Sequence, residues 1–262
     1  MPQADLAGVR IYYEVDGDSA KPCLALSNSL GTNLHLWDRV VPVLAPHFRL
    51  LRYDTRGHGR SSSPPTPWTI QSLASDVLCL LDHLMIRRCS FCGISLGGMT
   101  GMGLGIHAPE RIEKLVLANT GARIGTREGW NDRIRSVQSE GLEAISGPIL
   151  ERWFTPEFRR ACPAEVEAMR AMLVGTPAEG YAGCSAAIRD ANLTADLHRI
   201  NAQVLVVAGT HDLSTPLSDS RVLCQAIPRS RCITLTAAHL SPVEQPEEFA
   251  TAVISFLRCE EA

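Results

Sequence analysis

The sequence lacks an excess of charge of either sign and any long apolar run. Its 25 lysine and arginine residues nearly balance 28 aspartate and glutamate residues, which leaves a net charge of −3. A chain this close to neutrality has no general attraction for phosphate backbones or acidic membranes. No stretch approaches the roughly 18 uninterrupted apolar residues that a membrane-spanning helix requires. We therefore expect no nucleic-acid partner and no membrane partner.

The N-terminus also lacks the pattern of a secretory leader. Met1-Pro2-Gln3-Ala4-Asp5-Leu6 contains no basic segment followed by an apolar one. The nine cysteines are odd in number and scattered, which favours a reducing compartment over a disulfide scaffold. Together these features predict a cytoplasmic protein that acts on small molecules.

One cysteine pair, Cys89 and Cys92, has the C-x-x-C spacing of some metal and redox sites. The surrounding segment, Arg88-Cys89-Ser90-Phe91-Cys92, is typical of a strand. Residues three apart on a strand point to opposite faces of the sheet, so the two sulfurs are not expected to converge. We expect buried packing for both, and no metal or other cofactor.

Apolar strand-like runs alternate with helical segments along most of the 262 residues. This alternation is typical of an α/β protein with a mostly parallel sheet covered by helices on both faces. A glycine-rich helix after Ser95 is expected to be buried, since small residues allow close approach to the sheet. Strands are predicted over 9–15, 23–27, 48–53, 91–94, 114–118, 204–208 and 231–235, with a helix over 70–81.

The alternation stops between residues 120 and 192. That stretch has helical patterns but no convincing strand, and it separates two strands of the predicted sheet. We interpret it as a helical cap inserted over the strand ends. The predicted organisation is a core of residues 1–119 and 193–262 with a cap of residues 120–192.

The segment Gly93-Ile94-Ser95-Leu96-Gly97 matches G-x-S-x-G between a predicted strand and a predicted helix. In that context the motif forms a sharp turn that holds a nucleophilic serine in a strained conformation. A phosphate-binding glycine loop is the alternative. The segment does not match G-x-G-x-x-G, and no P-loop lysine follows it. The pattern favours Ser95 as a nucleophile.

A serine hydroxyl needs a base, which is oriented by an acid. Asp212 follows the predicted strand 204–208, and His239 follows the strand 231–235. Sites in open α/β sheets are built at such carboxyl ends of parallel strands, so we expect Asp212 to be the acid and His239 the base. Among the other histidines, His35 lies in a loop that is a candidate to face the pocket. We expect His58 to order a turn.

The oxyanion hole is predicted from two backbone N–H groups. One is that of Leu96, directly after the nucleophile, and the other comes from the loop after the first buried strand. That loop reads Ser27-Asn28-Ser29-Leu30-Gly31-Thr32, and its spacing to Trp37 favours the N–H of Leu30.

From about residue 9 onward the chain resembles the α/β-hydrolase superfamily and, within it, the 3-oxoadipate enol-lactonases of the β-ketoadipate pathway. Asn28-Ser29, where most members of the superfamily have His-Gly, is the feature that favours the lactonase branch. The other segments that carry the resemblance are Leu30-Gly31-Thr32, Tyr53-Asp54-Thr55-Arg56-Gly57-His58-Gly59, Gly93-Ile94-Ser95-Leu96-Gly97-Gly98, His211-Asp212-Leu213-Ser214-Thr215-Pro216 and Ala238-His239-Leu240-Ser241-Pro242-Val243-Glu244-Gln245-Pro246.

The resemblance implies a hydrolase that opens an enol-lactone through an acyl-enzyme on Ser95. That small substrate is anionic, so a cation in the cap is expected, and arginine suits a planar carboxylate best. Arg133, beside a helical apolar seam that contains Trp130, is the candidate. Trp153 belongs to a second aromatic patch. A solvated arginine and two core tryptophans are the alternative interpretation.

Two other functions are compatible with the same residues. The first is another hydrolase of this fold, such as a carboxylesterase, a C–C-bond hydrolase or a cofactor-free haloperoxidase. The second is a non-catalytic binding protein that kept the hydrolase scaffold. A serine at position 95 disfavours haloalkane dehalogenases and epoxide hydrolases, which resemble this fold but use aspartate there.

Overall fold

The computed structural model describes residues 2–6 and 8–259, so positions 1, 7 and 260–262 of the predicted core lie outside the described residues. Eight strands form a sheet in the order β1-β2-β4-β3-β5-β6-β7-β8. All neighbours from β4 to β8 are parallel, whereas β2 is antiparallel to β4 and β1 is antiparallel to β2. The strands are β1 (Gln3–Leu6), β2 (Val9–Asp16), β3 (Cys23–Ser27), β4 (Arg49–Tyr53), β5 (Cys89–Ile94), β6 (Ile112–Ala118), β7 (Gln203–Gly209) and β8 (Ser230–Leu235).

The central strands are continuous apolar runs because helices cover both of their faces. Every residue of β5 is buried, and β7 is buried from its second residue onward. The edge strand β8 has no buried residue and is half exposed. The predicted α/β class is therefore confirmed, and the well-covered strands β5 and β7 lead to Ser95 and Asp212, whereas the exposed edge strand β8 leads to His239.

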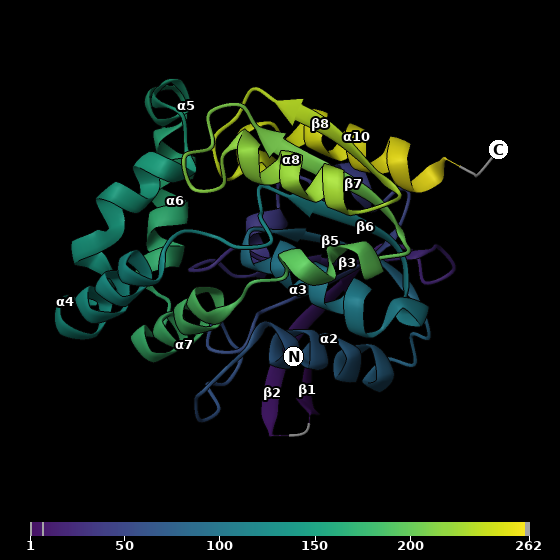
Figure 1. Ribbon diagram of the computed structural model, residues 1–262, viewed down its shortest axis with the longest axis horizontal. Helices are drawn as coiled ribbons and strands as arrows, with labels where there is room; N and C mark the ends of the chain where they lie inside the picture. The colour runs from purple at the N-terminus through teal and green to yellow at the C-terminus, as the bar shows by residue number, and fades with distance from the viewer. Residues whose placement is uncertain (1, 7, 260–262) are drawn as a thin grey trace.

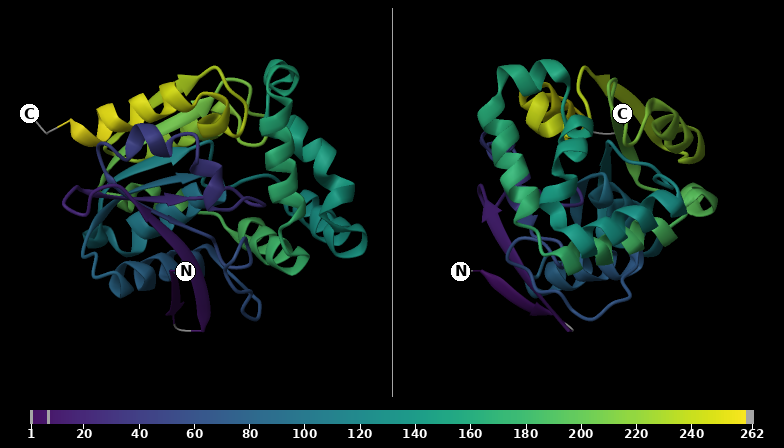
Figure 2. Two further views of the ribbon diagram at one scale, coloured as in Figure 1. Left: turned by 180° about the vertical axis from the view of Figure 1, so that it is seen from behind. Right: turned by 90° about the vertical axis from the view of Figure 1, so that its left-hand side faces the viewer.

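Helices lie on both faces of the sheet. One face carries α2, α3 and α8, and the other carries α1 and α10 (Figures 1 and 2). The glycine-rich α3 is buried from Leu96 to Ile106, as expected from its small residues. These core helices are α1 (Val41–Leu44), α2 (Ile70–His83), α3 (Leu96–His107), α8 (Leu217–Ala226), α9 (Ser241–Glu244) and α10 (Pro246–Arg258), with 3-10 helices at Leu34–Trp37, Pro109–Arg111 and Thr194–Arg199.

Between β6 and β7 the described chain contains helices and no strand. These helices, α4 to α7, lie at the end of the sheet toward which the arrows of β7 and β8 point (Figure 1). Gly141 interrupts α4 with a φ of 79°, so this helix consists of two segments that meet at a kink. The helices are α4 (Arg127–Trp153), α5 (Pro156–Ala161), α6 (Pro163–Val174) and α7 (Ala178–Asp190).

Two features differ from the sequence-based expectations. The four-residue strand β1 was not predicted, since Gln3-Ala4-Asp5-Leu6 is too short to show a period. Cys224 of α8 and Cys232 of β8 form a disulfide, whereas the scattered cysteines had favoured reduced thiols throughout. The pairing joins a helix to a strand that lie together only in the folded chain.

The remaining seven cysteines are free. Cys89 and Cys92 are both buried in β5, and Cys89 hydrogen-bonds Cys23 on the neighbouring strand. This agrees with packing as their role. Over residues 2–6 and 8–259, no helix combines the length and the apolar character needed to cross a membrane.

Candidate active site

Ser95 stands at the sharp turn between β5 and α3. Its backbone has a φ of 56° and a ψ of −115°, a conformation that costs a non-glycine residue free energy. The turn is possible only because its neighbours lack side chains. A Cβ on Gly93 would lie 2.1 Å from the carbonyl oxygen of Gly97, and a Cβ on Gly97 would lie 2.2 Å from that of Ser27. The strained turn predicted for this motif is present.

Asp212 and His239 come from the loops after β7 and β8, as the sequence predicted. Asp212 Oδ2 lies 2.9 Å from His239 Nδ1, and both side chains are buried. A carboxylate at this distance holds the imidazole with its proton on Nδ1, which leaves Nε2 to act as a base.

The carboxylate of Asp212 receives several further hydrogen bonds. The hydroxyl of Thr215 donates to Oδ2 at 2.7 Å, and the N–H groups of Ser214 and Thr215 donate to Oδ1 at 2.8 and 3.0 Å. Burial alone would raise the pKa of Asp212, but the His239 partner and the Thr215 donors outweigh it and lower the pKa to about 2. Asp212 is therefore an anion throughout the neutral range.

Asn119, which the sequence analysis did not single out, joins the acid loop to the base loop. Its Nδ2 donates to Asp212 Oδ2 at 3.0 Å and to the carbonyl of Ala238 at 3.1 Å, while its Oδ1 accepts from Ser241 Oγ at 2.6 Å. Its φ of 44° lies in the left-handed region that asparagine tolerates. The available signal was its place directly after the strand β6, beside the other strand ends.

Ser95 and His239 line the same cavity, but no hydrogen bond joins Ser95 Oγ to the imidazole in this structure. Such contacts are often long without substrate and tighten only when substrate is bound. The predicted nucleophile, acid and base thus lie at one end of the sheet, with the acid–base pair already formed.

The two loops of the predicted oxyanion hole are tied together by hydrogen bonds. The N–H of Gly97 donates to the carbonyl of Asn28 at 3.0 Å. The Asn28 side chain is buried, donates to the carbonyl of Tyr53 at 2.7 Å and accepts from Trp37 Nε1 at 2.8 Å. These contacts hold the Leu30 loop against the N-terminus of α3, so the N–H groups of Leu30 and Leu96 come from adjoining segments.

His58 orders its own turn, as expected, and also holds the predicted oxyanion loop. Its Nε2 accepts the N–H of Gly31 at 3.0 Å, and its Nδ1 lies 3.2 Å from the carbonyl of Arg56. Burial lowers the pKa of His58 to about 4, although the bond to Arg56 opposes this shift. A neutral histidine therefore supports the predicted oxyanion loop. His35 does not face the pocket: it is exposed and lies 3.0 Å from Asp38, because its place in the 3-10 helix directs it to solvent.

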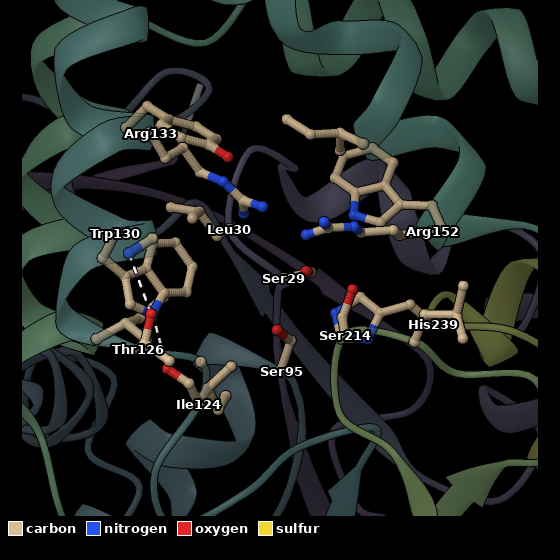
Figure 3. A pocket seen from close by; sticks show the side chains of 17 residues that line it. Ser29, Leu30, Ser95, Ile124, Thr126, Trp130, Arg133, Arg152, Ser214 and His239 are labelled. Carbon is tan, nitrogen blue, oxygen red and sulfur yellow. Dashed lines mark hydrogen bonds between the residues drawn. The ribbon is translucent and has the colours of Figure 1, made fainter.

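Above these residues lies a cavity of about 540 Å³ between the strand ends and the helices α4 and α7 (Figure 3). The candidates Trp130, Arg133 and Trp153 all line it. The other lining residues include Ser29, Leu30, Ile124, Thr126, Ile149, Tyr181, Ile188, Leu213 and Ser214.

A second arginine, Arg152, enters the cavity opposite Arg133, and the two guanidinium groups point toward each other (Figure 3). Arg133 lies over the Trp130 ring, 4.8 Å from its centroid, and hydrogen-bonds the hydroxyl of Tyr181. Among the described residues, no carboxylate forms a salt bridge with either guanidinium. Sequence reasoning missed Arg152 because one arginine on a helix rich in charge carries no distinguishing pattern.

Residues 24–246 match the model of the α/β-hydrolase fold family. The 3-oxoadipate enol-lactonase 2 of Acinetobacter baylyi is 42% identical over 250 residues, which are 95% of this chain and 94% of that protein. The crystal structure of the enol-lactonase from Burkholderia xenovorans has a TM-score of 0.96 and 42% identity, covering 98% of this chain and 99% of that one.

More distant relatives have other named activities. A protein of Agrobacterium fabrum with the provisional name carbamate hydrolase RutD is 29% identical over 258 residues, 94% of this chain and 98% of that protein. The similarity to several hydrolases agrees with the acid–base pair beside a serine. It leaves the choice of substrate to the residues of the cavity.

Proposed function

Because this chain belongs to the α/β-hydrolase fold family and has a hydrolase role, we propose that it opens 3-oxoadipate enol-lactone to 3-oxoadipate in the cytoplasmic β-ketoadipate pathway. The observation that carries the proposal is the position of two arginines, without carboxylate partners in the described chain, above Ser95 and the Asp212–His239 pair. That arrangement suits an ester whose far end is an anion.

In the first half of the reaction His239 Nε2 takes the hydroxyl proton of Ser95, and Ser95 Oγ attacks the lactone carbonyl carbon. The N–H groups of Leu30 and Leu96 donate to the oxyanion that forms, and one such donor is typically worth about 3 kcal/mol. The C–O bond of the ring then breaks. The leaving oxygen is an enol oxygen, which the protonated His239 protonates.

In the second half the enol converts to a ketone, which makes ring opening effectively irreversible. His239 then takes a proton from water, and the resulting hydroxide attacks the acyl-enzyme on Ser95. The serine leaves with the proton held by His239, and 3-oxoadipate is released. Asp212 stays ionised throughout, in keeping with its lowered pKa.

We assign the groups that recognise the substrate to the helical segment and the reacting groups to the rest of the chain. Residues 1–119 and 193–262 then act as the core and residues 120–192 as a cap. The planar carboxylate of a small anionic lactone suits the forked guanidinium groups of Arg133 and Arg152, and its ring suits the apolar surface of Trp130 and Trp153. A neutral ester gains nothing from the arginines.

The test is direct measurement of enol-lactone loss by ultraviolet absorbance, with muconolactone, a neutral p-nitrophenyl ester and a simple carbamate as comparison substrates. We expect the highest kcat/KM for the enol-lactone. Faster turnover of the carbamate or of the neutral ester than of the enol-lactone would contradict the proposed substrate. No hydrolysis of any of the four would favour a non-catalytic binding protein.

A further inference from the structure

Glu244 is a buried carboxylate that the proposed reaction does not use. It ends the short helix α9, five residues after His239, and only 8% of its surface is exposed. Within the described chain no lysine or arginine forms an ion pair with it. A charge buried without an ionic partner is costly unless hydrogen bonds replace its water.

Three donors from two separate segments satisfy this carboxylate. The N–H of Ala238, the residue before His239, donates to Oε2 at 2.8 Å. The N–H of Thr155, between α4 and α5, donates to Oε1 at 3.3 Å, and the Thr155 hydroxyl donates to the same oxygen. One side chain thus bridges the loop that carries the base to the helices over the cavity.

A second hydrogen bond, on the C-terminal side of His239, joins the same two segments. The N–H of Leu240, the residue after His239, donates to the carbonyl of Trp153 at 3.0 Å. Both neighbours of His239 are therefore bound to the segment 153–155, Ala238 through Glu244 and Leu240 directly. Trp153 also lines the cavity, so this segment contacts both the base loop and the space for substrate.

The remaining contacts of the base loop come from the core. Asn119 holds the carbonyl of Ala238, and the N–H of His211 donates to the carbonyl of Ala237 at 3.0 Å. The Asp212 bond fixes how the ring is turned, but it does not fix the height of the loop above Ser95. That height depends on what holds Ala238 and Leu240 from the other side.

We propose that Glu244 is a positioning residue that ties the His239 loop to the α4–α5 junction. It thereby sets the distance between His239 Nε2 and Ser95 Oγ. The inference rests on the proposed serine-hydrolase function but not on the identity of the lactone. Misplacing a catalytic group by about 1 Å can cost about a hundredfold in rate. Loss of the bridge should therefore lower the reactivity of Ser95 more than it weakens substrate binding.

The experiment measures the second-order rate of Ser95 labelling by a fluorophosphonate, followed by intact mass, on protein shown to be folded by thermal melting. Glu244→Gln keeps the shape of the side chain but replaces one acceptor oxygen with a donor. We expect it to label about 30-fold more slowly than wild type. With a neutral p-nitrophenyl ester, kcat should fall by a similar factor while KM stays within twofold.

Thr155→Val removes the hydroxyl and keeps the N–H, so a loss of about fivefold is expected. Thr155 Oγ also caps α5 by accepting the N–H of Phe158 at 3.2 Å. Thr69→Val is the matched control, because Thr69 caps α2 in the same way. That control and the rescue variant Thr155→Ser should both label within twofold of wild type.

The outcomes separate the two proposals. A wild-type protein that the fluorophosphonate does not label would contradict the serine-hydrolase function itself. A labelled wild type with Glu244→Gln and Thr155→Val both within twofold of it would overturn the positioning role alone. If Glu244→Gln does not fold, Thr155→Val decides. Slower labelling of Ser95 in Thr155→Val than in Thr69→Val supports the positioning role, and equal labelling rates overturn it.

Discussion

The strand ends and the cavity wall differ in how firmly their side chains are held. At the strand ends, Asp212 accepts hydrogen bonds from three residues besides His239. In the cavity wall, Arg133 is held by the hydroxyl of Tyr181 and the face of the Trp130 ring, and the side chain of Arg152 is exposed. Residues that must align a proton transfer are held by several hydrogen bonds each. Side chains that only select a ligand need fewer such contacts.

This difference orders the expected effects of substitution. Residues at the strand ends should affect kcat for every substrate, because they act on the reacting atoms. The two arginines of the wall should affect KM, and for anionic substrates only.

Removing the nucleophile should abolish turnover without unfolding the protein. For Ser95→Ala we expect kcat to fall by roughly 10⁴–10⁶ with every ester, and His239→Ala should do the same. The melting temperature should stay near that of wild type, since Ser95 contributes only small packing contacts. Retained activity in Ser95→Ala would transfer the nucleophile to another residue.

Asn119→Asp should be the next most damaging change. It replaces a donor with a second carboxylate beside Asp212 Oδ2 and the carbonyl of Ala238. Two carboxylates at this distance cannot both ionise freely, so Asp212 no longer holds His239 in its orientation. We expect kcat to fall by about a thousandfold near neutral pH, with KM little changed. A kcat within tenfold of wild type would remove Asn119 from the acid–base network.

His58 should make the protein less stable in mild acid. Its pKa is about 4 in the folded chain against an ordinary 6.5, so the unfolded chain alone binds the proton between these values. As the pH falls from 7 to 4, the free energy of unfolding should lose about 3 kcal/mol from this group. Urea unfolding of wild type and His58→Gln across this range measures it. An equal pH dependence in both proteins would contradict the assignment.

The arginines should show the smallest effect and the greatest selectivity. Arg133→Ala and Arg152→Ala should each raise KM for the enol-lactone about tenfold, as expected for a lost charge-assisted hydrogen bond. A neutral p-nitrophenyl ester should be unaffected. Arg135→Ala is the matched control, because Arg135 lies on the same helix but is exposed and paired with Asp132. An equal rise in KM for anionic and neutral substrates would exclude carboxylate binding by these arginines.

The sequence could predict the candidate reacting groups but not the residues that hold them in place. The turn at Ser95 and the order of Ser95, Asp212 and His239 follow from local patterns of strand, glycine and helix, which a single sequence displays. Asn119 and Glu244 act through hydrogen bonds to partners as far as 122 and 89 residues away, respectively, and their residue types give no indication of those partners. Spacing therefore indicates the candidate reacting groups but not the residues that hold them.

The wrong expectations have the same cause. His35 was a candidate for the pocket because of its loop, yet the direction of its side chain depends on a 3-10 turn and on Asp38. The disulfide between Cys224 and Cys232 depends on the docking of α8 against β8. Arg152 lies in the second half of α4, beyond the kink at Gly141, and only the folded chain shows that this half lines the cavity. Each of these outcomes is decided by tertiary contacts rather than by composition or period.

The most direct test is to identify the residue that carries the acyl group. Wild-type protein is quenched in acid during hydrolysis of p-nitrophenyl acetate and then digested for peptide mass mapping. We predict one acetyl group, on the peptide that contains Ser95. An acetyl group on a different residue, or a burst of p-nitrophenolate with no adduct at Ser95, would contradict the account.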